Sequence, residues 1–197
     1  MSDDETLSVY AAKAGDYANL TDDAAAQDPS LIAFVAAMPR RGRVLDLGCG
    51  PGGSAAVMAQ AGLVVDAFDP VPEMVALAGR HAGVSAREAG FEDVTQVDHY
   101  DGIWANFSLL HAPRDDMPKH LARIATALKP GGRFHIGVKT GTGSKRDTLG
   151  RRYTYYTESE LVDLLAAAGL TVFDRREGCD TGLDGVDAHW IVLAAHA

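Results

Sequence analysis

The stretch VLDLGCGPGG, residues 44–53, combines closely spaced glycines with one carboxylate. Its glycines have the G-x-G-x-x-G spacing typical of a turn that binds a dinucleotide, because residues without side chains let the backbone approach a ligand. Asp46 interrupts the apolar run before the first glycine, where a buried carboxylate is costly unless it meets a cation or hydrogen-bond donors. Pro51 lacks the N–H that a pyrophosphate site would use. The stretch therefore favours a ligand that carries a positive charge, such as an ammonium group, and no phosphate.

Such a turn needs a sheet to hold it, and the rest of the chain predicts one. Short apolar runs alternate with helical patterns from residue 43 onward, which indicates an α/β fold with a doubly wound, mostly parallel sheet. The last two runs are joined by CDTGLDGVDA, too short for a crossover helix, so we expect a terminal antiparallel hairpin. Ligands bind such sheets at the carboxyl ends of the strands, where the glycine turn lies. The seven predicted strands are 43–48, 63–69, 84–88, 100–108, 133–140, 170–177 and 189–196, and the predicted helices include 54–61, 72–82 and 157–169.

The chain length of 197 residues and the hydrophobic content of 47% predict a single globular unit. Residues 1–40 precede the sheet and predict one or two helices that form a lid over it, with Tyr10 and Tyr17 on one face. Residues 41–197 are expected to form the ligand-binding domain.

Composition narrows the class of partner. The net charge of −9 opposes binding to nucleic acid or to an anionic membrane, so a small-molecule substrate is favoured. The longest apolar run, LIAFVAAM, is far shorter than the ~18 residues of a membrane span. The first residues, MSDDETLS, do not read as a secretory signal, so a cytoplasmic location is expected. Cys49 and Cys179 predict reduced thiols, and the scattered histidines predict no metal site.

Several motifs together resemble the class I S-adenosylmethionine-dependent methyltransferases, in particular their bacterial small-molecule members. They are LDLGCGPGG, the acid Asp69 at the end of the second strand, YDGIWANFSLLH and LKPGGRFHI, and the resemblance covers residues 42–197. It implies a Rossmann-like methyltransferase fold, S-adenosylmethionine as cofactor and S-adenosylhomocysteine as product. It also implies that the Asp46 carboxylate lies near the methionine end of the cofactor and that Asp69 accepts from the ribose hydroxyls. The implied cofactor-binding residues are Asp46, Gly48, Cys49, Gly50, Asp69, Pro70, Phe91 and Asn106.

One part of the family pattern is missing here. The family often has an Asp after the third strand that contacts the adenine amino group, whereas this chain has Gly90 in the stretch EAGFEDV. Packing against Phe91 is one replacement, and the carboxylate of Glu92 or Asp93 is another.

Methyl transfer is a displacement at the sulfonium methyl, which depends on positioning and desolvation more than on acid–base groups. A thiolate or neutral amine needs no base, whereas a hydroxyl or protonated amine does. His111, after the fourth strand, is the candidate base, with Tyr155 as a second catalytic candidate. The alternative for His111 is packing against the next helix. Asn106 contacts the cofactor through its backbone or the substrate through its amide, or bonds only to a neighbouring loop.

The segment 139–152 carries five cations against one acid, a local charge of about +4. This excess either selects an anionic substrate or is a solvated charge run. The overlapping stretch RRYTYY, residues 151–156, has a strand-like alternation that places Tyr153 and Tyr155 on one face and Tyr156 on the other. The resulting candidates for substrate binding are Tyr10, Tyr17, Lys139, Arg152 and Tyr153.

Two further functions stay open on the sequence alone. A nicotinamide-dependent oxidoreductase would use the glycine spacing, but Asp46, Pro51 and the terminal hairpin oppose it. A non-catalytic protein that binds S-adenosylmethionine would need the same motifs, because an intact cofactor site does not establish turnover.

Overall fold

The computed structural model describes residues 3–15, 25–182 and 184–197, which are built around a seven-stranded sheet of strand order β3-β2-β1-β4-β5-β9-β8. The first five strands run parallel, β9 is antiparallel to β5, and β8 is antiparallel to β9. The predicted α/β sheet with its terminal hairpin is confirmed. The strands are β1 Arg43–Leu47, β2 Val64–Asp69, β3 Val84–Glu88, β4 Tyr100–Asn106, β5 Leu128–Lys139, β8 Thr171–Thr181 and β9 Asp187–His196.

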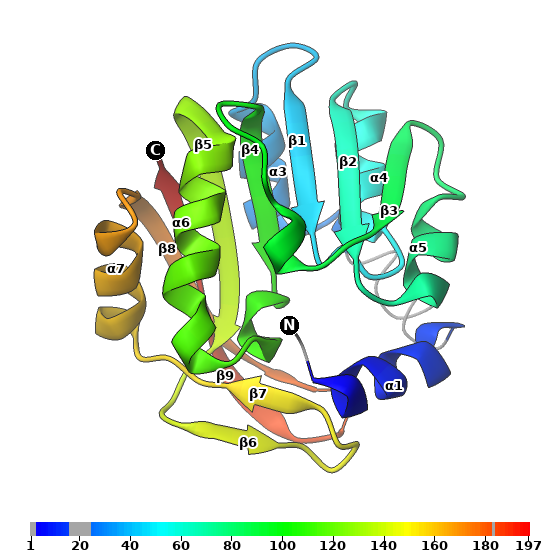
Figure 1. Cartoon of the computed structure of the whole chain (residues 1–197), viewed down its shortest axis with the longest axis vertical. Helices are drawn as coiled ribbons and strands as arrows, with labels where there is room; N and C mark the ends of the chain where they lie inside the picture. Colours follow the sequence, from blue (N-terminus) through cyan, green and yellow to red (C-terminus); the bar gives the residue numbers. More distant parts are fainter. Residues whose placement is uncertain (1–2, 16–24, 183) are drawn as a thin grey trace.

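Helices cover both faces of the sheet, as Figure 1 shows. They begin where the sequence supplies capping: the Asp28 side chain accepts from Ser30 N at the start of one helix, and Thr157 accepts from Glu160 N at the start of another. The helices are α1 Asp4–Ala12, α3 Pro29–Ala36, α4 Gly53–Gln60, α5 Pro72–Ala78, α6 Met117–Ala127 and α7 Glu158–Ala167. Short 3₁₀ turns span Phe91–Asp93, Leu109–His111 and Arg114–Asp116. Among the described residues, no helix has the length and apolar character needed to cross a membrane.

Several element boundaries and one small sheet differ from the sequence prediction. Helix α5 ends at Ala78, four residues before the predicted end. Strand β5 begins at Leu128, because Leu128 pairs with Tyr100 before the KPGG stretch shifts the register. A two-stranded sheet formed by β6 Ser144–Arg146 and β7 Arg152–Thr154 was not predicted. The strand-like alternation of 151–156 covers β7, whereas its partner β6 was missed because it is only three residues long.

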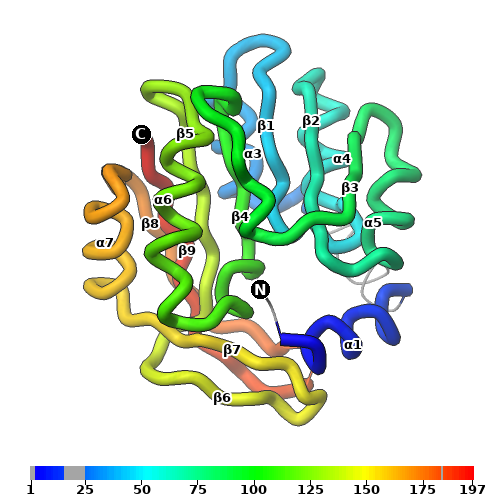
Figure 2. Tube along the Cα trace, in the orientation of Figure 1, coloured from blue at the N-terminus to red at the C-terminus, as the bar shows by residue number. Residues whose placement is uncertain are grey.

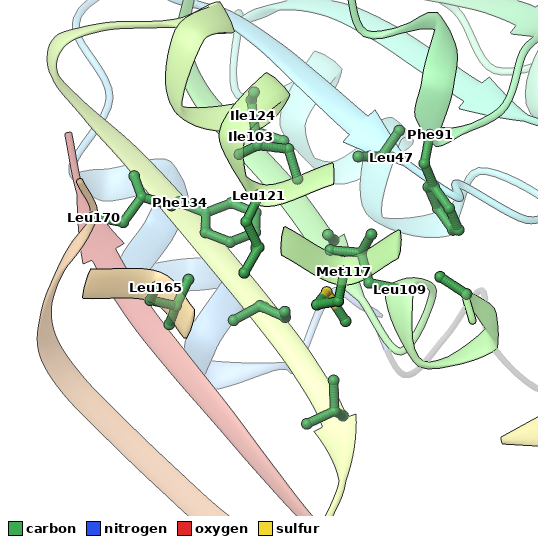
Figure 3. Close-up of a cluster of buried hydrophobic side chains, with 14 of the residues drawn as sticks. Leu47, Phe91, Ile103, Leu109, Met117, Leu121, Ile124, Phe134, Leu165 and Leu170 are labelled. Carbon is green, nitrogen blue, oxygen red and sulfur yellow. The ribbon is translucent and has the colours of Figure 1, made fainter. Parts of the chain in front are cut away.

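The core is divided between the two faces by the alternation along the strands. Leu45 and Leu47 of β1 join the cluster under α6 and α7, part of which Figure 3 shows. Val44 faces the opposite cluster, which contains residues of α3 and α4. By the same alternation, Asp46 lies on the α4 side, at the end of a strand that is buried on both faces.

The two helices within residues 1–40 have different surroundings. Helix α3 packs on the sheet, where the Phe34 ring meets the Trp104 ring edge to face at 5.3 Å between centroids. Helix α1 contacts α5 instead, and lies with β6 and β7 beyond the carboxyl ends of the parallel strands (Figures 1 and 2). A lid role for this part of the chain stays a prediction, and α1 is the helix whose position suits it.

Candidate active site

A cavity of about 410 Å³ lies at the carboxyl ends of β1, β2 and β4. Every residue predicted to bind the cofactor lines it: Asp46, Gly48, Cys49, Gly50, Asp69, Pro70, Phe91 and Asn106. Tyr10 and His111 line it from the other side. The topology thus brings the glycine turn and the candidate base to one space.

The glycine turn after β1 is held by backbone contacts on two sides. The N–H groups of Gly48 and Cys49 both donate to the carbonyl of Phe68 in β2, at 2.8 and 2.9 Å. Gly48 has φ of +76°, and a Cβ there would lie 2.3 Å from the Cβ of Ser108. Glycine is therefore required at this position both for the backbone conformation and for the close approach of the loop after β4.

Asp46 is a buried carboxylate that lacks a full set of partners. Its side chain accepts from the Ala55 backbone, but Oδ2 has no hydrogen-bond partner among the described residues. Burial, with a further contribution from the negative charge of Asp69, raises the pKa of Asp46 to about 7. A carboxylate in this state gains most from a ligand that brings a cation and N–H donors.

Asp69 at the end of β2 is bound to the turn and to the start of α5. Its Oδ2 accepts from Gly50 N and its Oδ1 from Val71 N, both at 2.9 Å. Burial raises the pKa of Asp69 to about 6, although these two hydrogen bonds oppose the increase. Each carboxylate oxygen has a further lone pair, so the geometry leaves room for a pair of ligand hydroxyls.

His111 is buried in the opposite wall and has both ring nitrogens engaged. Its Nδ1 lies 2.7 Å from the carbonyl oxygen of Arg152, which can only accept, so Nδ1 carries the proton. Nε2 is then the acceptor, and the Tyr10 hydroxyl of α1 donates to it at 2.9 Å. Burial, with a smaller contribution from the charges of Arg151 and Lys139, lowers the pKa of His111 to about 4. The imidazole is therefore neutral near pH 7, with its lone pair directed at the Tyr10 hydroxyl.

Behind this wall lies a cluster of cations and aromatic rings. Arg151 and Asp147 form a buried ion pair, with side-chain exposures of 3% and 5% and Nη2–Oδ2 at 2.7 Å. The Arg151 guanidinium also lies over the rings of Tyr10 and Tyr153. The Lys139 ammonium lies 4.0 Å from the centroid of the Tyr153 ring, and burial lowers the pKa of Lys139.

The predicted substrate residues divide accordingly. Tyr10 lines the cavity, whereas Lys139, Arg152 and Tyr153 lie behind the lining, and Tyr17 lies outside the described residues. Tyr155 packs near Tyr153 at 6.4 Å between ring centroids and does not line the cavity, so its catalytic role stays a prediction. Arg152 acts here through its backbone, which donates to Thr6 Oγ1 and accepts from His111.

Sequence reasoning missed Arg151, Phe107 and Asp180. The alternation that groups Tyr153 with Tyr155 also places Arg151 on that face and Arg152 on the other, so the signal was present. Phe107 lines the cavity at φ of +54°, an uncommon conformation for a bulky residue, which no sequence pattern indicated. Asp180 reaches the cavity because β8 extends past the predicted strand end, and its carboxylate accepts from Trp190 Nε1 at 2.8 Å.

The structure shows which of the candidates for adenine contact lie at the cavity. Phe91 lines the cavity, and its ring meets His120 edge to face at 5.3 Å between centroids. Asp93 accepts from Gly90 N at 2.7 Å, and neither Glu92 nor Asp93 lines the cavity. Phe91 is thus the better placed of the sequence candidates. In the part of the chain that the structure describes, no group of three or more His, Cys, Asp or Glu side chains is arranged to hold a metal ion.

The lining fits S-adenosylmethionine on the observations above. The orphaned oxygen of Asp46 matches the need of an ammonium group, and the second acid, Asp69, offers lone pairs to hydroxyls. The positive-φ glycines at 48 and 50 bring backbone close to the same space. None of these features requires a phosphate.

Comparisons with known proteins agree with this fit. Residues 44–132 match the family model described as a methyltransferase domain. A solved Burkholderia thailandensis structure, 1,6-didemethyltoxoflavin-N1-methyltransferase with bound 1,6-didemethyltoxoflavin and S-adenosylhomocysteine, is 30% identical with a TM-score of 0.79. The match covers 98% of this chain and 87% of that one.

Curated relatives match over a shorter region. The ubiquinone biosynthesis O-methyltransferase of Xanthomonas axonopodis pv. citri is 32% identical over 59% of this chain and 52% of the relative. The trans-aconitate 2-methyltransferase of Mycolicibacterium gilvum is 34% identical over 66% of this chain and 58% of the relative. The chain thus spans between half and three-fifths of these two relatives.

Proposed function

The chain belongs to the class I S-adenosylmethionine-dependent methyltransferases, and from that premise we propose that it methylates a small-molecule acceptor at a nitrogen or oxygen atom held against His111. The observation that carries the proposal is that two unlike walls face one cavity. One wall has the acids Asp46 and Asp69 on the glycine turn, and the other has a neutral histidine with a fixed tautomer. Nitrogen ranks first because the relative matched over 98% of this chain is an N1-methyltransferase.

The acids on the glycine turn and the backbone beside them are proposed to bind the cofactor. Asp46 receives the ammonium group, which supplies the cation that its buried carboxylate lacks, and Asp69 accepts from the ribose hydroxyls. Backbone groups of Gly48, Cys49 and Gly50 contact the cofactor, with Pro70 and Phe91 beside the adenine. When bound, S-adenosylmethionine supplies an electrophilic methyl carbon, and the pair of electrons of its carbon–sulfur bond returns to sulfur as the acceptor attacks.

His111 is proposed to take the proton that the acceptor loses. The Arg152 carbonyl holds its proton on Nδ1, so Nε2 presents a lone pair, at present shared with the Tyr10 hydroxyl. A histidine of low pKa is a weak base. It suffices here because a nitrogen or oxygen that is gaining a methyl group becomes strongly acidic as the new bond forms. The Tyr10 side chain must yield some of this contact to the acceptor, which is consistent with α1 as a mobile lid.

We extend the proposal to an acceptor that bears negative charge. In the segment 139–152, Arg146 pairs with Asp3 and Glu5, and Arg151 pairs with Asp147. The other cations, Lys139, Lys145 and Arg152, have no carboxylate within salt-bridge distance in the described ranges. The electric field of these three cations extends past Tyr153 to the wall of the cavity that is proposed to hold the acceptor. There it favours a weak acid or an anion.

The test is a methyl-transfer assay by mass spectrometry with an acceptor panel. The panel comprises 1,6-didemethyltoxoflavin, trans-aconitate and a simple catechol, each with S-adenosylmethionine, alongside calorimetric titrations with S-adenosylhomocysteine and NAD(H). The expected result is binding of S-adenosylhomocysteine, none of NAD(H), and product from at least one acceptor that is lost in His111→Asn. Tight binding without turnover across wider acceptor libraries would favour a non-catalytic binding protein instead. Equal turnover in His111→Asn would remove the base from the proposal.

A further inference from the structure

His135, on β5, is a buried histidine that the reaction described above does not use. It is 3% exposed, and its ring stacks on the Trp104 ring with 3.6 Å between centroids and 14° between planes. Burial lowers the pKa of His135 to about 3, so the ring is neutral and has a single N–H. Which ring nitrogen carries that N–H decides which neighbouring group can accept a hydrogen bond from the ring.

The partner of His135 fixes its tautomer. Nε2 lies 3.0 Å from Oδ1 of Asn106, the last residue of β4. A carboxamide oxygen can only accept, so Nε2 carries the proton and donates it. This hydrogen bond holds the Asn106 amide with its oxygen towards β5, the orientation that the structure shows.

Gly137 provides the space in which this oxygen lies. A Cβ at residue 137 would be 2.5 Å from Asn106 Oδ1 and 3.2 Å from a methyl carbon of Val192. Any larger residue would therefore displace the amide from its contact with His135. This glycine is needed for close approach rather than for backbone conformation.

The other end of the amide has no such partner. Asn106 lines the cavity, and its nitrogen Nδ2 donates to no other residue within 3–15, 25–182 and 184–197. Nδ2 is also not among the fully enclosed polar atoms that lack a partner. With the oxygen held by His135, the side-chain group that Asn106 has left to offer a ligand is its N–H donor.

We propose that His135 is a positioning residue that turns the Asn106 amide so that its N–H groups bind a carbonyl or carboxylate oxygen of the ligand in the cavity. The inference rests on the proposed function for the identity of that ligand. The oxygen belongs either to the carboxylate of the cofactor or to the methyl acceptor, and both sources have the same chemistry. The subsite selects for an oxygen acceptor and against a donor at this place, because a donor would face the N–H groups.

The orientation itself is tested without any ligand. Nitrogen-15 NMR of the histidine rings in the whole protein should show His135 as the neutral Nε2–H tautomer from pH 5 to 8. A His135 ring with its proton on Nδ1 would overturn the proposal, because Nε2 would then accept and the amide would be reversed. This result does not depend on turnover or on cofactor binding.

The ligand contact is tested with three variants. Asn106→Asp keeps the shape and replaces the donors with a carboxylate, His135→Phe keeps a flat ring on Trp104 without a donor, and His135→Gln keeps a donor. We expect Asn106→Asp to weaken binding about 10- to 100-fold, His135→Phe to lower the same affinity by a smaller factor, and His135→Gln to restore part of it.

The titrations use S-adenosylhomocysteine and 5′-methylthioadenosine, which lacks the amino-acid part, and the KM of the acceptor found in the panel above. Weaker S-adenosylhomocysteine binding with unchanged 5′-methylthioadenosine binding assigns the oxygen to the cofactor. An increased acceptor KM at constant kcat assigns it to the acceptor. Unchanged binding and KM in a folded Asn106→Asp protein would overturn the proposal. Failure of the unsubstituted protein to bind S-adenosylhomocysteine would count against the proposed function, while the NMR result would still decide the orientation.

Discussion

The two walls of the cavity are built in different ways. The wall proposed to bind the cofactor, termed the cofactor wall, comes mainly from one stretch, residues 46–74, in which β1, the glycine turn, α4 and β2 follow each other along the chain. The wall proposed to hold the acceptor, termed the acceptor wall, combines α1, the loop after β4 and the end of β8, which are far apart in sequence. The first wall can therefore be recognised from residue spacing. The second exists only once the chain has folded.

The walls also differ in electrostatics. Burial raises the pKa values of Asp46 and Asp69 on one side and lowers that of His111 on the other. Each shift opposes the charged form, so the ligand-free cavity holds groups that are poised to gain from a charged ligand. The acids gain from a cationic cofactor. On the proposed function, the cations behind His111 would in turn gain from an acidic acceptor.

The largest expected loss of stability comes from Arg151→Met, which disrupts the cluster behind the acceptor wall. The substitution leaves Asp147 buried and without its ion-pair partner, which costs about 3–5 kcal/mol in free energy of unfolding. The matched control is Arg175→Met, because the Arg175–Glu158 pair is exposed and should change stability by less than about 1 kcal/mol. Urea unfolding of both variants checks this. Equal losses would mean that the cluster behind His111 does not stabilise that wall.

Much of the fold and the cofactor wall followed from the sequence, for a physical reason. The positions of Asp46, Gly48 and Asp69 are set by local backbone geometry at the ends of strands. Those strands can be recognised because their apolar residues alternate with polar ones or form continuous runs. The acceptor wall was predicted less well, because Lys139 and Arg152 were chosen by charge, whereas burial selected Arg151. Arg151 lies just before β7, and its packing against Tyr10 of α1 decided that this cation faces inward, a contact that residue type alone does not reveal.

Breaking the cofactor wall at Gly48→Ala should have the next largest effect. The added Cβ meets Ser108 at 2.3 Å in addition to the strain of a positive φ. Strain of about 1–2 kcal/mol and overpacking of about 1–3 kcal/mol together destabilise the protein and displace the turn. Gly62→Ala is the control, since φ there is +84° with no atom within 4 Å of an added Cβ, so it should show the strain alone. Thermal unfolding with and without S-adenosylhomocysteine compares them; similar losses would argue against the steric contact.

A smaller effect is expected from Asp69→Ala, which removes the proposed hydrogen bonds to the cofactor together with those that Asp69 accepts from Gly50 N and Val71 N. Asp69→Ala should weaken S-adenosylhomocysteine binding by about 1–3 kcal/mol, or roughly 5- to 150-fold in Kd. Asp180→Ala changes an acid on the opposite side of the same cavity and should leave this Kd unchanged. Calorimetric titration of the two variants tests whether the walls are separable. A matching loss in Asp180→Ala would place the cofactor differently from the proposal.

The smallest expected signal is a fraction of a proton released when S-adenosylmethionine binds at pH 6.5. The pKa of Asp46, about 7 in the ligand-free protein, should fall when an ammonium group arrives, so part of its proton leaves. The α-amino group stays protonated at this pH and contributes little. Calorimetry in buffers of different ionisation enthalpy measures the release, and Asp46→Asn should remove most of it; proton uptake by the unsubstituted protein would contradict the assignment.

The same carboxylate links the cofactor wall to stability. Because the folded pKa of Asp46 is raised above its ordinary value of 3.8, its contribution favours folding fully below about pH 4 and is lost as the pH rises through about 7. Asp46→Asn should therefore raise the free energy of unfolding of the ligand-free protein at pH 8 while weakening cofactor binding. Opposite signs in these two measurements, from one substitution, would show that the cavity keeps an unstable charge because the cofactor needs it. Losses in both would mean that Asp46 is a structural acid.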